Sequence, residues 1–169
     1  GSQAHFSGIY DLIKFRVMEI LLISTEYDAY VLEEDGQLVE QIYHQFNDLS
    51  IPYIPRIHWA ANQSEAMEVL AAGEIHLIIT MSRISDMNSF ELECAIHQVH
   101  PDIPIVMLSY DRLTPSVIKQ IRKISCIDRI FYWSGDNRVL LAIIKYIEDK
   151  KNLENDSKLG VQAILVVDD

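Results

Sequence analysis

Short runs of consecutive apolar residues alternate along the chain with longer segments whose apolar residues recur at helical spacing. Five stretches have the length of a strand, and they are EILLIS (19–24), RIHWA (56–60), HLIITM (76–81), PIVMLS (104–109) and DRIFYW (128–133). RIHWA is the least apolar of them. A run without polar alternation is typical of a strand that is buried on both faces of a parallel sheet. The pattern therefore predicts five parallel strands.

The segments between these runs predict helices at about 28–46, 62–73, 89–100, 114–125 and 137–153. Two of them begin with recognisable caps. Asn62 and Glu65 have capping-box spacing, and Thr114 is followed by Pro115, which suits a first helical position. Strands that alternate with helices predict an α/β fold, a flavodoxin-like doubly wound five-stranded parallel sheet with helices on both faces.

Segments at both ends of the chain add to this domain, which we expect to span residues 19–150. The stretch SGIYDLIKF (7–15) predicts an extra N-terminal helix, and Gly1-Ser2 resembles a cloning remnant, so residues 1–18 are assigned to both. The stretch EDKKNLENDSKLG, at residues 148–160, indicates the tail of the last helix followed by a linker at 151–160.

The last nine residues, VQAILVVDD (161–169), look like the start of a second copy of the domain. When ILVVDD is set over ILLIST (20–25), the apolar positions coincide, and the carboxylates of Asp168 and Asp169 fall on Ser24 and Thr25. We therefore expect 161–169 to be the first strand of a truncated second domain.

Composition narrows the classes of function. The chain has 169 residues, 49% of them hydrophobic, and a net charge of −11, with no basic stripe of the kind that nucleic acid or an anionic membrane would require. Two cysteines, Cys94 and Cys126, fit free thiols better than a disulfide framework. We find no signal peptide and no apolar run that would span a bilayer, which favours a cytoplasmic protein.

Cofactor and metal motifs are weak. Gly135 and Gly160 stand alone rather than in a phosphate-binding loop. His97 and His100 have a spacing that can ligate a metal, but no third ligand stands near them in the sequence, so helix-surface histidines are the simpler interpretation. We expect no cofactor, no metal and no catalytic residue in this segment.

Four stretches in order resemble the receiver domain of bacterial response regulators: ILLISTE, LIITMSRISDMNSFEL, IPIVMLSYD and DRIFYWSGDNRVLLAIIKYI. The resemblance covers residues 19 to about 150 and implies a role in two-component signalling or a phosphorelay. It implies a phosphoryl group accepted by an aspartate after the third strand. An acid pair after the first strand holds magnesium, and a Ser or Thr and a Lys complete such a site.

The chain departs from that pattern at nearly every position. The acid pair becomes Ser24 and Thr25, the phosphoacceptor becomes Met81 and the lysine becomes Trp133, while Ser109 retains the hydroxyl. Magnesium prefers anionic oxygen ligands, and a thioether prefers soft metals. The resemblance is therefore to a degenerate receiver, a pseudo-receiver that acts without aspartyl phosphorylation.

Two alternatives stay open. Phosphate could be accepted by a residue beside the lost site, and the candidates are Glu26, Thr80, Ser82, Ser85 and Asp86, although turn, strand-end and cap roles explain such residues more simply. Alternatively, Ser24, Thr25, Met81 and Ser109 could line a neutral pocket for a small ligand.

The expected partner is another protein. Tyr132 and Trp133 end the fifth strand, on the face (fourth helix, fifth strand, fifth helix) that receivers use for partners. Charged residues share this face, and they are Lys119, Arg122, Arg138, Lys145 and Asp149. We expect a protein partner or an isologous dimer there. Trp133 itself could instead cover the core where a lysine reaches in.

A second resemblance concerns the whole protein. EYDAYVLEEDGQLVEQI, TMSRISD and IFYWSGDNRVLLAIIKYIEDK resemble the N-terminal region of bacterial proteins related to phosphoenolpyruvate synthase and pyruvate phosphate dikinase. This resemblance implies a multidomain enzyme of which the present segment is a non-catalytic, regulatory front end, next to a neighbouring receiver domain.

Overall fold

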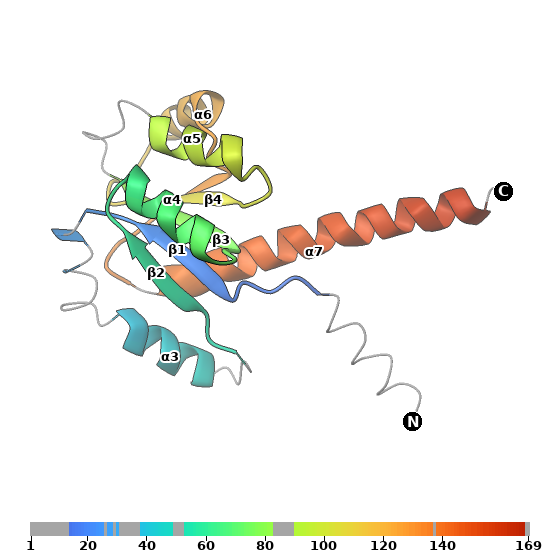
Figure 1. Cartoon of the computed structure of the whole chain (residues 1–169), viewed down its shortest axis with the longest axis horizontal. Coiled ribbons are helices and arrows are strands. Elements are labelled where there is room, and N and C mark those ends of the chain that lie inside the picture. The colour runs from blue at the N-terminus through green and yellow to red at the C-terminus, as the bar shows by residue number, and fades with distance from the viewer. Residues whose placement is uncertain are drawn as a thin grey trace.

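One five-stranded parallel sheet forms the centre of the molecule, with the strand order β2-β1-β3-β4-β5 (Figure 1). The computed structural model describes residues 14–25, 27–28, 30, 38–48, 53–82, 90–136 and 138–167, without the side chains of 38, 39, 41, 82 and 159–167. The strands are β1 Glu19–Ile23, β2 Arg56–Ala60, β3 Leu77–Ser82, β4 Ile105–Ser109 and β5 Arg129–Tyr132. All five lie where the apolar runs predict them, and the expected α/β fold class is confirmed.

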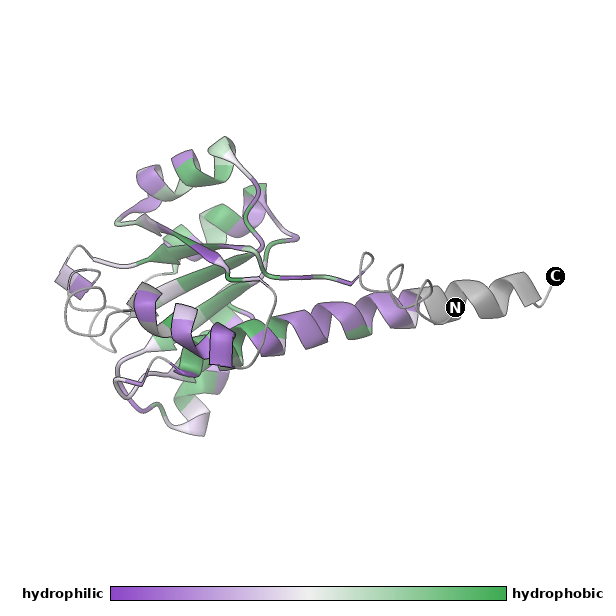
Figure 2. Ribbon diagram, turned by 90° about the horizontal axis from the view of Figure 1, so that it is seen from below, coloured by the Kyte–Doolittle hydropathy of each residue, from purple (hydrophilic) through white to green (hydrophobic). Residues whose placement is uncertain are grey.

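Helices cover both faces of the sheet. They are α3 Leu38–Asp48, α4 Gln63–Ala72, α5 Glu91–Val99, α6 Pro115–Ile124 and α7 Arg138–Val167. Figure 1 shows α4, α5 and α6 on one side of the sheet and α3 and α7 on the other. The central strands β1, β3 and β4 are mostly hydrophobic and buried, because both of their faces are covered, and Figure 2 shows this hydrophobic centre of the sheet.

Two hydrophobic cores result, one on each face of the sheet. Adjacent residues of β3 contribute to different cores: Ile79 packs in the core with α3 and α7, and Ile78 in the core with α4, α5 and α6. Both side chains are fully buried. This alternation follows from the two-residue period of a strand.

The two predicted helix caps are confirmed. The backbone N–H of Glu65 donates to Asn62 Oδ1 at 2.9 Å, and the Glu65 carboxylate accepts from the N–H of Ala61 at 2.7 Å. At α6, Thr114 Oγ1 accepts from the N–H of Val117 at 3.3 Å.

The N-terminal helix predicted at 7–15 falls mostly outside the described residues. Residues 14–18 are described and are not helical, which contradicts the last part of that prediction. Instead this segment leads into β1 beside α7. The N–H of Phe15 donates to Asn152 Oδ1 at 2.7 Å, and that of Val17 donates to the Glu148 carboxylate at 2.9 Å. These side-chain acceptors on α7 replace the bonds that a helix would supply.

The C-terminal end also differs from the prediction. Residues 151–167, expected as a linker and a strand, continue α7 as a single helix of 30 residues. A helix satisfies its backbone hydrogen bonds within itself, whereas a strand needs a neighbouring strand to pair with. Asp168 and Asp169 lie outside the described residues, and a second domain copy stays a prediction.

Within the described part of the chain, no helix is long and apolar enough to cross a membrane.

Candidate functional site

The predicted site residues gather at the carboxyl edge of the sheet, because parallel strands end on the same side. Ser24 directly follows β1, Met81 lies near the end of β3, Ser109 ends β4 and Trp133 follows β5. The register confirms this proximity, since Met81 pairs with Leu108, and Ser109 pairs with Ser82 on one side and with Tyr132 on the other.

Met81, the position at which a receiver would hold its aspartate, is enclosed by apolar and aromatic groups. Its side chain is 9% exposed and belongs to the core between the sheet and α7. The hydroxyl of Tyr110 donates to Met81 Sδ at 3.8 Å. The Tyr110 ring in turn meets Trp133 edge-on, with 5.4 Å between the ring centroids. The thioether is therefore covered by a tyrosine, which is itself held by the tryptophan.

The hydroxyl groups of this edge bond to their own loops. Ser24 Oγ donates to the Thr25 carbonyl at 3.3 Å, and Thr25 Oγ1 accepts from the N–H of Asp28 at 3.1 Å. Ser109 is 1% exposed; its Oγ donates to the Asp111 carbonyl at 2.8 Å and accepts from the Asp111 N–H at 3.1 Å. These bonds fix the turns after β1 and β4, so the hydroxyls serve loop geometry.

Trp133 packs against the same core and donates its backbone N–H to the Ser109 carbonyl at 2.9 Å. Its ring is half-buried. This placement agrees with the alternative in which Trp133 covers the core. Tyr132, by contrast, is 42% exposed, and the Arg112 guanidinium lies 5.1 Å from the centroid of its ring.

The neighbouring phosphate-acceptor candidates are separated from this edge or not described. Thr80 is buried on the opposite face of β3, where its Oγ1 donates to Glu93 Oε1 at 3.0 Å. The side chain of Ser82 and the whole of Glu26, Ser85 and Asp86 lie outside the described residues. The buried Thr80–Glu93 pair was missed by sequence reasoning, although a glutamate on the apolar face of α5 was a usable signal.

Of the charged residues expected at the partner face, Arg138 already has a partner. Its guanidinium lies 2.6 Å from Asp136, whose Oδ1 also accepts from the Arg138 backbone N–H at 3.0 Å. Hydrogen bonds from Arg138 lower the pKa of the Asp136 carboxyl. Lys119, Arg122 and Lys145 are exposed.

No three histidine, cysteine or carboxylate side chains of the described residues form a cluster that could hold a metal ion. His97 and His100 lie at the end of α5, and His97 is exposed.

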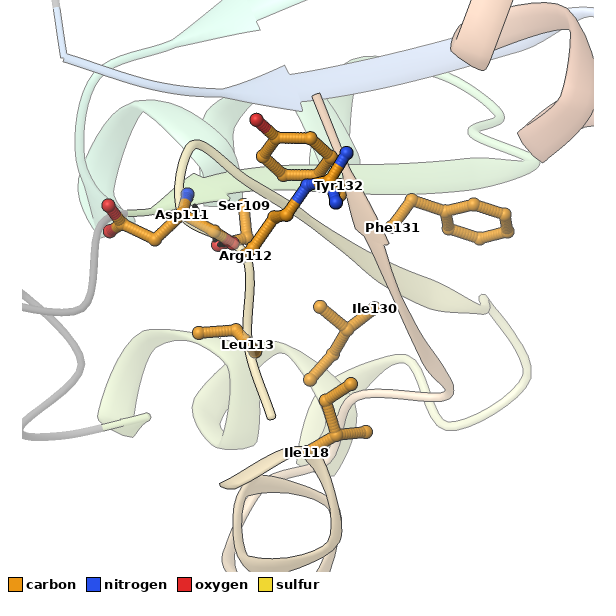
Figure 3. Close-up of a pocket in the computed structure, with 8 residues that line it drawn as sticks. All are labelled: Ser109, Asp111, Arg112, Leu113, Ile118, Ile130, Phe131 and Tyr132. Carbon is orange, nitrogen blue, oxygen red and sulfur yellow. Dashed lines mark hydrogen bonds between the residues drawn. The ribbon is translucent and has the colours of Figure 1, made fainter. Parts of the chain in front are cut away.

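A cavity of about 270 Å³ opens beside this edge, between the loop after β4, α6 and β5 (Figure 3). Its lining residues are Ser109, Asp111, Arg112, Leu113, Ile118, Ile130, Phe131 and Tyr132. Figure 3 shows Leu113, Ile118 and Ile130 converging, with Arg112 and Tyr132 together at another side. Of the residues predicted to line a neutral ligand pocket, only Ser109 lines this cavity.

Known proteins resemble this chain in structure, although comparisons with family models and curated proteins find no match. No model of a protein family matches the chain, and a search of curated proteins finds no match either. Solved structures do match. The signal receiver domain of an HD domain-containing protein from Pseudomonas fluorescens Pf-5 is 24% identical, with a TM-score of 0.56 over 84% of this chain and 94% of that one.

A two-component response regulator from Clostridium difficile is 21% identical, with a TM-score of 0.57 over 80% of this chain and 98% of that one. A CheY-like response regulator receiver domain protein from Methanospirillum hungatei JF-1 is 17% identical, with a TM-score of 0.54 over 82% and 98%. The chain has the receiver fold. In this receiver-like domain, Met81 and Tyr110 occupy the carboxyl edge of the central strands.

Proposed function

We propose that this receiver-like domain is a non-catalytic interaction module whose state is not set by aspartyl phosphorylation. The observation that carries the proposal is the enclosure of Met81 by Tyr110 at the end of β3. A thioether cannot accept a phosphoryl group as a carboxylate does, and the aromatic cover leaves the position inside the core.

The rest of the edge supports the same conclusion. Magnesium binds oxygen ligands, anionic ones above all, in tight octahedral geometry. Ser24 and Thr25 offer neutral hydroxyls that already bond to backbone groups of their own loop. Trp133 offers no cation to balance the charge of an acyl phosphate. The alternative acceptor Thr80 is buried against Glu93, a carboxylate that would repel a phosphate group.

The direct test is to add magnesium with acetyl phosphate or beryllofluoride to the purified chain. Amide NMR and the fluorescence of Trp59 and Trp133 would report any response. We expect no saturable change at millimolar magnesium, and a receiver with an intact acid pair serves as the positive control. Magnesium-dependent, saturable shifts around Met81 and Ser109 would overturn the proposal.

We infer further that the partner binds at a basic surface on α6. Seven basic residues but only two acidic ones, Asp128 and Asp136, lie between positions 112 and 145, although the whole chain has a net charge of −11. The basic surface is defined as Arg112, Lys119, Arg122 and Lys123, which are all exposed. Among the described residues, none of these four lies within salt-bridge distance of a carboxylate.

The basic surface adjoins apolar space. A shallow groove of about 560 Å³ is lined by Pro115, Ile118, Lys119, Arg122 and Lys123, and it shares Ile118 with the 270 Å³ cavity. This combination suits an acidic protein segment that carries one apolar side chain. The apolar side chain would enter the cavity between Leu113 and Ile130, while carboxylates face the basic surface, as in interfaces with complementary potentials.

A displayed library of random peptides would test this chemistry. We expect the selected peptides to be acidic with one large apolar residue, to bind more weakly as salt rises, and to lose at least tenfold affinity for the Lys119→Glu/Arg122→Glu variant. Lys14→Glu/Arg56→Glu is the control, because it changes the charge equally at exposed positions elsewhere. Equal binding to both variants, or a dimer formed through α6 in sedimentation, would contradict the proposed partner.

For the full protein, we propose that this domain is a regulatory part ahead of a second receiver that begins near Val161. The support is the alignment of ILVVDD with ILLIST and the resemblance to proteins related to phosphoenolpyruvate synthase and pyruvate phosphate dikinase. The proposal requires residues 161–167, helical in this chain, to become a strand when partner strands are present. Carbon chemical shifts of a chain extended by one domain length would report this change, and persistent helical shifts would contradict it.

A further inference from the structure

Two thiols outside the candidate site face each other at close range. Cys94 lies on α5, and Cys126 lies in the connection between α6 and β5. Cys126 Sγ donates to Cys94 Sγ at a distance of 3.0 Å, and both residues are half-buried free thiols. A disulfide bond measures about 2.05 Å, so closing this contact to a covalent bond needs a movement of about 1 Å.

We propose that Cys94 and Cys126 form a site of oxidative modification, at which a small disulfide compound is reduced and the two side chains join in an intramolecular disulfide. The proposal does not depend on a protein partner and goes beyond the interaction role proposed above. The co-reactant is a low-molecular-weight disulfide, and the product is a disulfide bond that links α5 to the α6–β5 connection.

The reaction has two exchange steps. The thiolate of Cys94, which accepts the hydrogen bond, attacks one sulfur of the compound RSSR, so a mixed disulfide forms and RS⁻ leaves. Cys126 then loses its proton to solvent and attacks Cys94 Sγ, which expels the second RS⁻. In total, two thiols and RSSR give one protein disulfide and two RSH, and two electrons pass from the cysteines to the compound.

The surroundings determine which compounds react fastest. The hydrogen bond to Cys94, then burial, then the negative charges of Glu93 and Asp128 raise the pKa of the Cys126 thiol to about 11. Cys126 therefore stays protonated near neutral pH, and its attack on the mixed disulfide is slowed. Lys150 lies 3.8 Å from the Asp128 carboxylate. The carboxylates of Asp128 and Glu93, which act on Cys126, favour a cationic disulfide such as cystamine over the anionic oxidised glutathione.

The disulfide would enclose α6, the helix that carries most of the basic surface, in a cross-linked loop. The two cysteines are 32 positions apart, so the disulfide closes a loop that contains β4 and all of α6. Cross-linking a loop of this length restricts the unfolded chain more than the folded one. We expect the oxidised chain to unfold at a temperature several degrees higher than the reduced chain.

The test uses the intact chain with cystamine in native buffer, followed by alkylation and intact mass spectrometry. We expect loss of two hydrogens, no retained cysteamine and no alkylated thiol. The ring-closing step, measured as the decay of the mixed disulfide, should be at least tenfold faster in native buffer than in concentrated urea, because the fold holds the two sulfurs together. The overall rate with cystamine divided by the overall rate with oxidised glutathione should be larger in native buffer than in concentrated urea.

Two single substitutions complete the test. Cys94→Ser and Cys126→Ser should each stop at a mixed disulfide with one retained cysteamine, and circular dichroism would show whether each variant is folded. A wild-type chain that keeps cysteamine on either thiol, or that closes the disulfide no faster in native buffer than in urea, would overturn the proposal. The comparison of native buffer with urea does not depend on how the variants fold.

Discussion

At the scale of single residues, Met81 shows how far sequence alone can go. Because the apolar run HLIITM fixes the position of β3, the residue at its carboxyl end was known before the structure. The contact with Tyr110 was not predicted, since it depends on the conformation of the loop after β4. The Thr80–Glu93 pair was missed for a related reason, because it joins a strand to a helix whose relative placement no local pattern fixes.

Placing an aspartate at Met81 tests the proposal that this position alone would prevent phosphoryl transfer to the domain. We expect Met81→Asp to destabilise the fold by about 2–4 kcal/mol, because a carboxylate would be buried in an apolar core. Urea unfolding would measure this loss. Met81→Leu is the matched control, and it should cost less than about 1.5 kcal/mol. We expect no response to acetyl phosphate and magnesium from Met81→Asp, because Ser24 and Thr25 remain neutral; a response would show that the hydroxyls suffice.

Glu148 provides a pH-dependent prediction. Its pKa is raised, chiefly by burial, although its hydrogen bond from Val17 opposes the shift. The folded chain therefore holds this proton more tightly than the unfolded chain, and the stability contributed at low pH is lost as pH rises through the folded-state pKa. Glu148→Gln keeps an acceptor for Val17 without the charge. We expect a gain of up to about 1 kcal/mol at pH 7.

The ordinary pKa of this carboxyl is 4.5. Well below that pH the Glu148 side chain is neutral, like the glutamine that replaces it, so the gain from Glu148→Gln should vanish there. Urea unfolding at both pH values would show the difference. Glu148→Ala lacks the acceptor and should lose about 1 kcal/mol at either pH. A pH-independent effect of Glu148→Gln would contradict the role of burial.

At the scale of elements, periodicity and caps located the five strands and, among the described residues, α3 to α7, because each carries a local signal. The helix predicted at about 28–46 is confirmed over 38–46, and residues 31–37 lie outside the described part of the chain. Two segments broke the rule. Phe15 and Val17 bond to side chains of α7, which lies outside their segment. Residues 151–167 continue α7, because a helix bonds within itself and a strand there would need a neighbouring strand. The residues of these two segments do not by themselves indicate which other part of the chain they will pair with.

The outer part of α7 should be the least protected helix of the domain. Figure 1 shows this helix extending away from the sheet, and Figure 2 shows a hydrophilic stretch there. Residues 153–158 are all exposed, whereas Ile143, Ile144 and Ile147 are buried. A helix without tertiary packing is marginal in water. We expect amides of residues 155–167 to exchange with deuterium at least tenfold faster than those of 141–150; equal protection would indicate an additional contact.

At the scale of the whole molecule, two cores share one sheet. Ile78 and Ile79 are adjacent, fully buried and members of different cores. We expect Ile78→Ala and Ile79→Ala each to cost about 2–5 kcal/mol. Because both cores depend on β3, each variant should still unfold in one transition, with near-ultraviolet and far-ultraviolet circular dichroism changing together. Ile→Val at each position is the mild control, and two separate transitions would show that the cores unfold independently.

The length of α7 has a geometric consequence. A helix advances about 1.5 Å and turns about 100° for each residue, so its 30 residues extend about 45 Å. Its first half packs against the sheet, so while the outer half is helical, a group held on it has a set distance and a set angle to β1 and β3. Inserting one residue near Asp156 would rotate such a group by about a quarter of a circle while hardly changing its distance. The number of residues in α7 therefore sets the direction in which such a group faces. Its direction can be changed with little change in its distance from the sheet.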